Sequence, residues 1–389
     1  MTEIKTPERM KIVEKVAELG PKFAARADKV DTDAVFPYEN WADMKDAGLL
    51  GIVIPESEGG LGGDFVAYAL ASEELARHCA STALTFNMHV ATTLLVGEVS
   101  GLLGLEGEQK AFLDQRRKTL WQGVIENGDI HSQPFSEGIA AGATAGYATR
   151  AEPVDGGFLV TGRKIFASLS GASTFHNVIC QVEGDDRLRL LGIPHEGEGV
   201  TIDGEWDPLG MRGTDSRNLL MDKVFVPFEH EWLPPGVFND AANRFPYFFM
   251  TLSFSYLGLM RGILDFTEEY LKTGGRADHV IKQQGWAEMN IQYEQAQALL
   301  YRVLSDVQVD PEHDKVQRAW AALVTIMEGA PEMASTAIRV CGGRSLLRPS
   351  YIERAYRDAR CGATMLPWSV EVCLQRLGQT RLFDDEQGD

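Results

Sequence analysis

The sequence predicts an α+β fold with three successive parts: a helical N-terminal domain, a middle antiparallel β-domain and a C-terminal four-helix bundle. Apolar residues recur at helical spacing up to about residue 118 and again after about residue 240. Between these limits, short runs rich in β-branched and aromatic residues alternate with Gly, Asp and Pro, which is typical of antiparallel strands. We therefore expect domains at residues 1–119 (helical), 120–235 (β-barrel or sandwich) and 236–389 (helical bundle).

The N-terminal domain begins with a capped helix. Thr6 precedes Pro7, and proline suits the first helical position because its missing N–H would have no partner there. Two further helices are expected over about 65–79 and 81–103, and residues 51–56 read as a short extended run.

The spacing of apolar residues changes along the chain, and this change predicts the β-domain and the C-terminal bundle. Asp155-Gly156-Gly157 is a good hairpin turn, because such pairs adopt the positive φ angles of tight hairpins. The β-prone runs are Tyr147–Pro153, Phe158–Val160, Val178–Val182, Leu188–Ile193 and Val224–Val226. The C-terminal helices are expected at Phe248–Lys272, Gln283–Val307, Lys315–Val340 and Leu366–Leu377.

The charge balance and the cysteines limit the class of protein. A net charge of −19 disfavours nonspecific contact with nucleic acid or an anionic membrane, so any phosphate site has to be locally basic. No apolar run reaches the ~20 residues that span a bilayer, and the polar N-terminus is no secretory signal. The five cysteines are odd in number and lack CxxC spacing, which argues against a zinc site and favours a reducing cytoplasm. Metal-ligand, Walker and Rossmann patterns do not occur, so we expect a cytoplasmic protein without a metal.

Several motifs follow one another in a fixed order along the chain. They are FP at 36–37 with AGLLGIVIPESEGG at 47–60, FSEG at 135–138, GRKIFAS at 162–168, LGMRGTDS at 209–216 with VFVP at 224–227, and IERAYRDAR at 352–360. Each motif alone is weak, but the ordered set resembles the acyl-CoA dehydrogenase superfamily of flavoproteins over nearly the whole chain. The resemblance implies FAD, an acyl-CoA or acyl-carrier-protein substrate, electron-transfer flavoprotein or another electron acceptor, and a homotetramer or homodimer.

Four residues of the β-domain are candidates for contact with the flavin ring, which needs an apolar wall and hydrogen-bond donors at its edge. Phe166 and Ser168 stand at i and i+2 on one expected strand, so both side chains leave the same face. Phe135 and Ser136 would do similar work from a neighbouring strand end. The alternative is that these residues are an ordinary core aromatic and turn hydroxyls.

A second cofactor segment is expected near the end of the chain. Arg339, Gly342 and Gly343 occupy the family's Gln-x-x-Gly-Gly segment, which approaches the FAD pyrophosphate of a neighbouring subunit. The family's Arg-x-x-Phe-Gly pyrophosphate segment is poorly matched around Arg276. We therefore expect Arg339, in place of glutamine, to supply a phosphate-pairing charge, with a surface arginine as the alternative.

The catalytic base of the family is missing at its usual place. In the family a glutamate stands six residues after the last basic residue of the C-terminal motif, and here that position is Leu366. The nearest carboxylate, Glu371, would lie about 140° further around a helix. The other base position of the family corresponds to 247–249, which is Tyr-Phe-Phe. His89 remains as the candidate acid or base, although a lone histidine on an apolar helix face is more often a core residue.

Three functions stay open at this point. The first is α,β-dehydrogenation of an acyl thioester, in which a base removes the α-proton while the β-hydride passes to flavin N5. The second is a flavin-dependent monooxygenase or oxidase on the same fold, which needs no α-proton base. The third is a catalytically impaired flavoprotein subunit. Fold-level resemblance is a weak basis for choosing among them.

Overall fold

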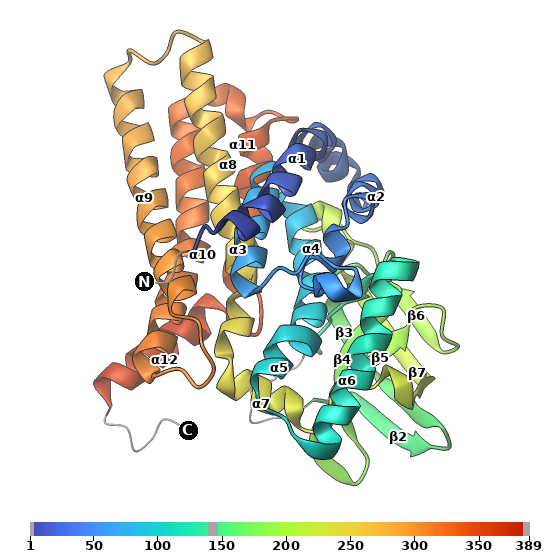
Figure 1. Ribbon diagram of the computed structural model, residues 1–389. Coiled ribbons are helices and arrows are strands. Elements are labelled where there is room, and N and C mark those ends of the chain that lie inside the picture. Colours follow the sequence, from blue (N-terminus) through green and yellow to red (C-terminus); the bar gives the residue numbers. More distant parts are fainter. Residues whose placement is uncertain (1–3, 139–146, 384–389) are drawn as a thin grey trace.

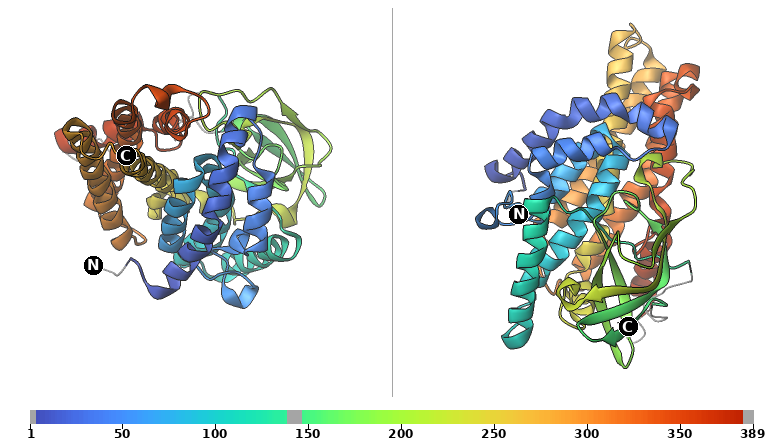
Figure 2. Two further views of the ribbon diagram at one scale, coloured as in Figure 1. Left: turned by 90° about the horizontal axis from the view of Figure 1, so that it is seen from above. Right: turned by 90° about the vertical axis from the view of Figure 1, so that its right-hand side faces the viewer.

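The computed structural model describes residues 4–138 and 147–383, and it divides into two helical parts and one sheet. In Figures 1 and 2, helices α3 and α4 lie between α9 on one side and the sheet on the other. One hydrophobic core joins the N-terminal and C-terminal helices, and a second, smaller core fills the sheet. The expected order of helices, strands and helices is therefore confirmed.

The N-terminal helices begin as the sequence predicts. Thr6 Oγ1 accepts a hydrogen bond from the N–H of Arg9 (3.4 Å), so it caps α1. Residues 51–56 are not extended: they form turns around a 3₁₀ segment at Leu49–Gly51, because local backbone hydrogen bonds close them. Helix α6, which the sequence did not single out, buries only Leu113 and Leu120. The helices are α1 (Pro7–Asp33), α2 (Tyr38–Asp46), α3 (Phe65–His78), α4 (Ala80–Leu94), α5 (Ser100–Leu102) and α6 (Gly107–Gln122).

The middle part is a curled sheet with strand order β1-β4-β2-β3-β7-β6, and β5 pairs with β4. Val154 pairs with Gly157, which confirms the hairpin turn at residues 155–156. The expectation of a purely antiparallel sheet is wrong, because β4 pairs in parallel with both β1 and β2. The strands are β1 (His131–Ser132), β2 (Arg150–Val154), β3 (Gly157–Ala167), β4 (Phe175–Val182), β5 (Asp185–Pro194), β6 (Val200–Asp203) and β7 (Arg217–Pro227).

In the C-terminal part, α8, α9 and α10 pack together and α12 packs on α10. The expected helix Leu366–Leu377 starts later, at Val370, after a loop over residues 361–369. Leu366 and Glu371 therefore do not share a helix, and their expected 140° separation is wrong. The helices are α7 (Val237–Arg244), α8 (Leu252–Thr273), α9 (Val280–Ser305), α10 (His313–Cys341), α11 (Tyr351–Arg360) and α12 (Val370–Leu382).

Helix α8 is the central helix of this core. With the preceding turn, Pro246–Thr273 is long and apolar enough to cross a bilayer, but 83% of its apolar window is buried inside the protein. Burial of this kind is typical of the core helix of a globular protein. The sequence boundaries of the three domains stay a prediction. Among the described residues, the change from helix to strand falls between Asn127 and His131, and the return to helix between Pro227 and Val237.

Candidate flavin and substrate site

Two of the segments expected to contact a flavin lie side by side. The N–H of Ile165, in β3, donates to the carbonyl oxygen of Ser136 (2.8 Å), which joins the 135–138 segment to the strand that carries Phe166 and Ser168. One residue away, Lys164 Nζ lies 2.7 Å from Glu137 Oε1, and the two side chains are 0% and 2% exposed. The structure thus joins the segment of Phe135 and Ser136 to the C-terminal end of β3, where Phe166 and Ser168 lie.

The buried ion pair is fully hydrogen-bonded, as a buried charge has to be. Lys164 Nζ also donates to the carbonyl oxygen of Ile179 (2.9 Å). Glu137 accepts from the N–H and the hydroxyl of Thr149 (3.1 and 2.6 Å) and from the N–H of Ala148 (2.5 Å). Burial raises the pKa of Glu137, but these hydrogen bonds outweigh it and leave the pKa below its usual value. The pair fixes the expected flavin segment to β3.

Phe166 has the geometry of a ring-binding side chain. It adopts φ 53°, which is rare for a bulky residue, and it is 64% exposed. Its ring lies 6.3 Å from that of Trp206 in an edge-to-face arrangement. Ser168 is held in place, because its Oγ lies 2.8 Å from Ser216 Oγ. The N–H of Ser168 donates to the carbonyl oxygen of Phe166 (2.9 Å), so the chain turns here and the two side chains do not leave one strand face as expected. The exposed ring of Phe166 suits contact with a planar group.

A buried unpaired amide supports the same fit. Gln133 is 8% exposed and stands two residues before Phe135, yet its Nε2 has no hydrogen-bond partner among the described residues. Buried polar groups are normally hydrogen-bonded, so the amide needs a partner beyond the residues that the structure describes. Phe135 packs edge-to-face on Phe238 at 5.8 Å. The residues present therefore fit a flavin ring.

The loop that carries Leu366 packs against the other position at which the family carries its base, and both positions are apolar. Trp368, in the 361–369 loop two residues after Leu366, lies 6.0 Å from the ring of Phe249 and 6.0 Å from the ring of Trp320. Phe249 in turn lies 5.7 Å from Phe248. Residues 246–250 and 361–369 contain no Asp, Glu or His. This aromatic wall offers no proton acceptor of the usual kind.

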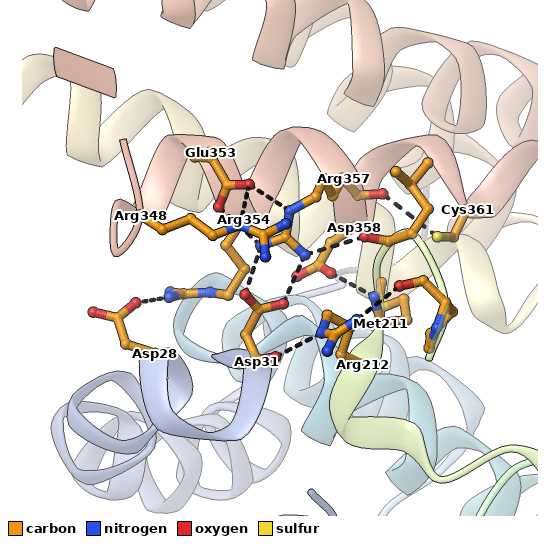
Figure 3. A network of polar contacts seen from close by, with 12 residues as sticks. Asp28, Asp31, Met211, Arg212, Arg348, Glu353, Arg354, Arg357, Asp358 and Cys361 are labelled. Carbon is orange, nitrogen blue, oxygen red and sulfur yellow. Dashed lines mark hydrogen bonds and ion pairs between the residues drawn. The ribbon is translucent and has the colours of Figure 1, made fainter. Parts of the chain in front are cut away.

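A polar network fixes the loop that carries Leu366 (Figure 3). Arg357, in α11, makes two bonds to the carboxylate of Asp31 in α1 (2.8 and 2.5 Å) and two to Glu353 (2.6 and 2.9 Å). The next residue, Asp358, accepts the N–H of Met211 (2.5 Å). Burial raises the pKa of Asp358 to about 6. The network joins α1, the 209–216 loop and α11 at the start of the 361–369 loop.

The structure places His89 in the core rather than at an open site. It is 0% exposed, its Nε2 lies 2.9 Å from the carbonyl oxygen of Leu50, and its Nδ1 accepts the N–H of His131 (3.2 Å). Because Nδ1 accepts, the proton is on Nε2, and burial lowers the pKa of His89 to about 4. Both ring nitrogens are occupied, which favours the core role. The catalytic role of His89 stays a prediction without support from this geometry.

Arg339, Gly342 and Gly343 lie apart from the flavin segments within one chain. They lie at the C-terminal end of α10, and this end of the helical bundle is the one far from the sheet (Figures 1 and 2). Gly342 adopts φ 86° and ψ −172°, a conformation open only to glycine, and a Cβ on either glycine would meet nothing within 4 Å. Arg339 is exposed and has no partner among the described residues. The exposed end of α10 leaves the Arg339 side chain accessible to another subunit.

The sequence reasoning missed the groups that hold these segments in place. Lys164 lies on the same strand face as the buried Phe158 and Val160 of β3, and a charge on that face signals a buried partner. Asp31 had no such signal, because its partner Arg357 is 326 residues away in the sequence.

Comparison with known proteins agrees with this geometry. The family models for the acyl-CoA dehydrogenase N-terminal, middle and C-terminal domains match residues 6–100, 136–224 and 238–365. The putative acyl-CoA dehydrogenase YdbM of Bacillus subtilis is 25% identical over 370 residues, 92% of this chain and 93% of that protein. The mitochondrial short-chain specific acyl-CoA dehydrogenase of Homo sapiens is 27% identical over 347 residues, 86% of this chain and 80% of that protein.

Solved structures share the fold at lower identity. KijD3 in complex with FMN and a dTDP-amino-keto sugar has a TM-score of 0.84 at 21% identity, covering 97% of this chain and 94% of that chain. Dibenzothiophene monooxygenase (TdsC) from Paenibacillus sp. A11-2 scores 0.80 at 22% identity, with 95% and 96% covered. Butyryl-CoA dehydrogenase from Megasphaera elsdenii scores 0.81 at 20% identity, with 98% and 100% covered. At these identities the likeness extends to the fold alone.

Proposed function

Because the chain belongs to the acyl-CoA dehydrogenase family, we propose that it is a flavin-dependent oxidoreductase whose substrate lies against an aromatic wall without a carboxylate base. The proposal of a flavin rests on the segments that the Lys164–Glu137 ion pair holds together and on the unpaired amide of Gln133. A bound flavin accepts electrons from a substrate and, once reduced, reacts with dioxygen. The residues of this chain would bind and orient it.

Each flavin-binding residue has a distinct part in this proposal. Phe166 provides the flat apolar wall, and Ser168 offers a hydroxyl at the ring edge. Ser136 and Gln133 stand at the other segment, where a carbonyl or amide edge of the ring would meet a donor. We propose FAD as the cofactor, with Arg339 of a neighbouring copy pairing with its pyrophosphate in a homodimer or homotetramer.

The single observation that carries the choice of reaction is the contact between Trp368 and Phe249. It brings the loop that carries Leu366 against the other base position of the family, at Phe248–Phe249, and neither position carries a carboxylate. Abstraction of an α-proton needs a proton acceptor within hydrogen-bond reach. Oxygenation or oxidation of an apolar substrate by a flavin makes no such demand, so the site fits a monooxygenase or oxidase best.

A second candidate, α,β-dehydrogenation of an acyl thioester, is favoured by the sequence relatives. The short-chain specific acyl-CoA dehydrogenase of Homo sapiens matches 86% of this chain. An acyl-CoA or acyl-carrier-protein substrate and electron-transfer flavoprotein as acceptor belong to this candidate. It requires a base at a position other than 366 and 248, where Leu366 and Phe248 stand. His89 is unsuited, because both of its ring nitrogens already have hydrogen-bond partners.

One experiment, with an anaerobic part and a part in air, separates the two candidates. The flavin-loaded protein is mixed with acyl-CoA esters of several chain lengths, and the visible flavin absorption is followed. We expect no bleaching, and we expect rapid oxygen consumption with product formation when reduced flavin and an aromatic or aliphatic substrate are supplied in air. Bleaching by any acyl-CoA would overturn the choice of oxygenation. A purified protein that binds neither FAD nor FMN would overturn the flavin proposal itself.

The part assigned to Arg339 has its own test. Arg339→Ala is expected to weaken FAD binding by about tenfold, the effect of one charge-assisted hydrogen bond, and to leave FMN binding unchanged because FMN lacks the pyrophosphate. Fluorescence titration with each flavin measures both. Equal FAD affinity in Arg339→Ala and the parent protein would contradict this role.

A further inference from the structure

A pocket lies where the end of α6 meets the sheet. Its volume is about 360 Å³, within the range of roughly 300–1,000 Å³ of small-molecule sites. It shares no residue with the flavin segments or the aromatic wall. The side chains that matter here are Glu126, Asp129, His131, Phe175, His230 and Trp232.

His131 presents an unused donor in this pocket. Trp232 Nε1 donates to Asn177 Oδ1 (2.7 Å), which fixes the orientation of that amide. The amide nitrogen of Asn177 therefore faces His131 Nδ1 at 3.3 Å, so Nδ1 is the acceptor and Nε2 holds the proton. His131 is 1% exposed, and its Nε2 has no partner among the described residues. A ligand oxygen at this point would satisfy a donor that residues 4–138 and 147–383 leave unpaired.

Two carboxylates line the same pocket without an ion pair. Within residues 4–138 and 147–383, neither Glu126 nor Asp129 has a basic group within 4.0 Å, and Lys45 instead donates to the carbonyl oxygen of Asn127 (3.1 Å). Gly123 makes room for Asp129, because a Cβ there would lie 2.3 Å from Asp129 Oδ2. Burial raises the pKa of Asp129, and a hydrogen bond from the Asn127 side chain and the charge of Lys45 only partly offset this effect. Two carboxylates without a direct ion pair attract a further cation.

Aromatic rings form the remaining wall. Phe175 stacks on His131 with 5.4 Å between ring centres and meets His230 edge-to-face at 4.8 Å. Trp232 lies 5.4 Å from His230, whose buried Nδ1 also has no partner among the described residues. The faces of such rings attract ammonium groups. The wall and the carboxylates therefore favour the same kind of ligand.

We propose that this pocket binds a small primary amine, in its ammonium form, that also carries a hydrogen-bond-accepting oxygen. The ammonium group lies between Glu126 and Asp129 against the aromatic wall, and the oxygen accepts the Nε2–H of His131. Binding here is independent of the flavin reaction, since the pocket holds none of the residues assigned to it.

The probe that tests this is ethanolamine, which carries both groups, added to the flavin-loaded full-length protein with ¹⁵N-labelled histidine. Ethylene glycol lacks the charge, and ethylamine lacks the oxygen. We expect a saturable shift of the His131 Nε2 resonance with ethanolamine, and none with ethylene glycol. Ethylamine is expected to bind without shifting Nε2.

Charge variants complete the test. Asp129→Asn is expected to weaken ethanolamine binding by about tenfold. Asp186→Asn removes the same charge from an exposed position of β5 and is expected to change nothing. Unchanged affinity in Asp129→Asn would overturn the proposal, as would an equal shift with ethylene glycol. Absence of any saturable shift with ethanolamine would do the same.

Discussion

Removal of Lys164 is expected to destabilise the protein and release the flavin. In Lys164→Met the carboxylate of Glu137 stays buried but loses its cation. Breaking a buried pair by removing one partner costs about 3–5 kcal/mol. Glu137 keeps three donors from Thr149 and Ala148, so the cost falls at the lower end, about 3 kcal/mol.

Urea unfolding and thermal melting measure this cost. For a chain of this length, about 3 kcal/mol corresponds to a fall in Tm of roughly 4 °C. The flavin retained after gel filtration reports the second effect, because the ion pair fixes the 135–138 segment to β3. Lys118→Met is the matched control: it makes the same change at an exposed position of α6.

The outcome that would refute this reasoning is specific. Glu137→Gln combined with Lys164→Met removes both charges, so the double variant should regain much of the stability lost by Lys164→Met. A loss below about 1 kcal/mol in Lys164→Met, the range of an exposed pair, would mean that the carboxylate is not buried. Full flavin retention despite the loss of stability would separate the pair from the flavin segment.

Three further predictions concern the base position, the core histidine and the α11 network. Leu366→Glu is expected to gain anaerobic flavin bleaching with butyryl-CoA that the parent protein and Leu366→Gln lack; bleaching by the parent at the same rate would contradict this. His89 contributes stability that is complete above its ordinary pKa of 6.5 and is lost as pH falls toward about 4, because burial favours its neutral form. Between pH 7 and 5, the free energy of unfolding of His89→Gln, measured with urea, should therefore fall less steeply than that of the parent protein. The difference in slope should correspond to about one bound proton, and a pH dependence equal to the parent's would rule the core role out. Arg357→Met should cost about 3–5 kcal/mol in urea unfolding because Asp31 loses its partner, whereas Arg360→Met, on the same helix with a 53% exposed side chain, should cost below about 1 kcal/mol. Similar costs for these two arginine variants would argue against a buried network.

The fold could be predicted from the sequence because its signals are local. Thr6-Pro7 starts a helix and the 155–156 turn makes a hairpin within a few residues of chain. The parallel pairing of β4 with β1 and β2 could not be predicted, since strand direction depends on segments up to 44 residues apart, such as Ser132 and His176. The prediction that a helix begins at Leu366 was wrong because a proline follows Leu366 and disfavours the helical conformation there. Helix α12 begins only at Val370.

The candidate site was predictable where neighbours in sequence are neighbours in space. The N–H of Ile165 joins Ser136 to β3, as the neighbouring motifs suggest. The two-residue period fails at Phe166, because its φ of 53° turns the chain and leaves Phe166 exposed while Ser168 is buried. His89 shows the limit, because a helix position alone does not reveal that Leu50 and His131 occupy both ring nitrogens. Such partners lie 39 and 42 residues away.

The two missing bases differ in their surroundings. In the sequence, Leu366 and Phe248–Phe249 are separate departures from the family, more than 100 residues apart. In the structure, Trp368 brings the loop that carries Leu366 against Phe249 and Trp320. A carboxylate in place of Phe248, which is 4% exposed, would be buried, and burial would raise its pKa toward the protonated form, which is a poor base at neutral pH. Leu366 is 48% exposed, so a carboxylate there would stay ionised, and position 366 is the better place to restore a base.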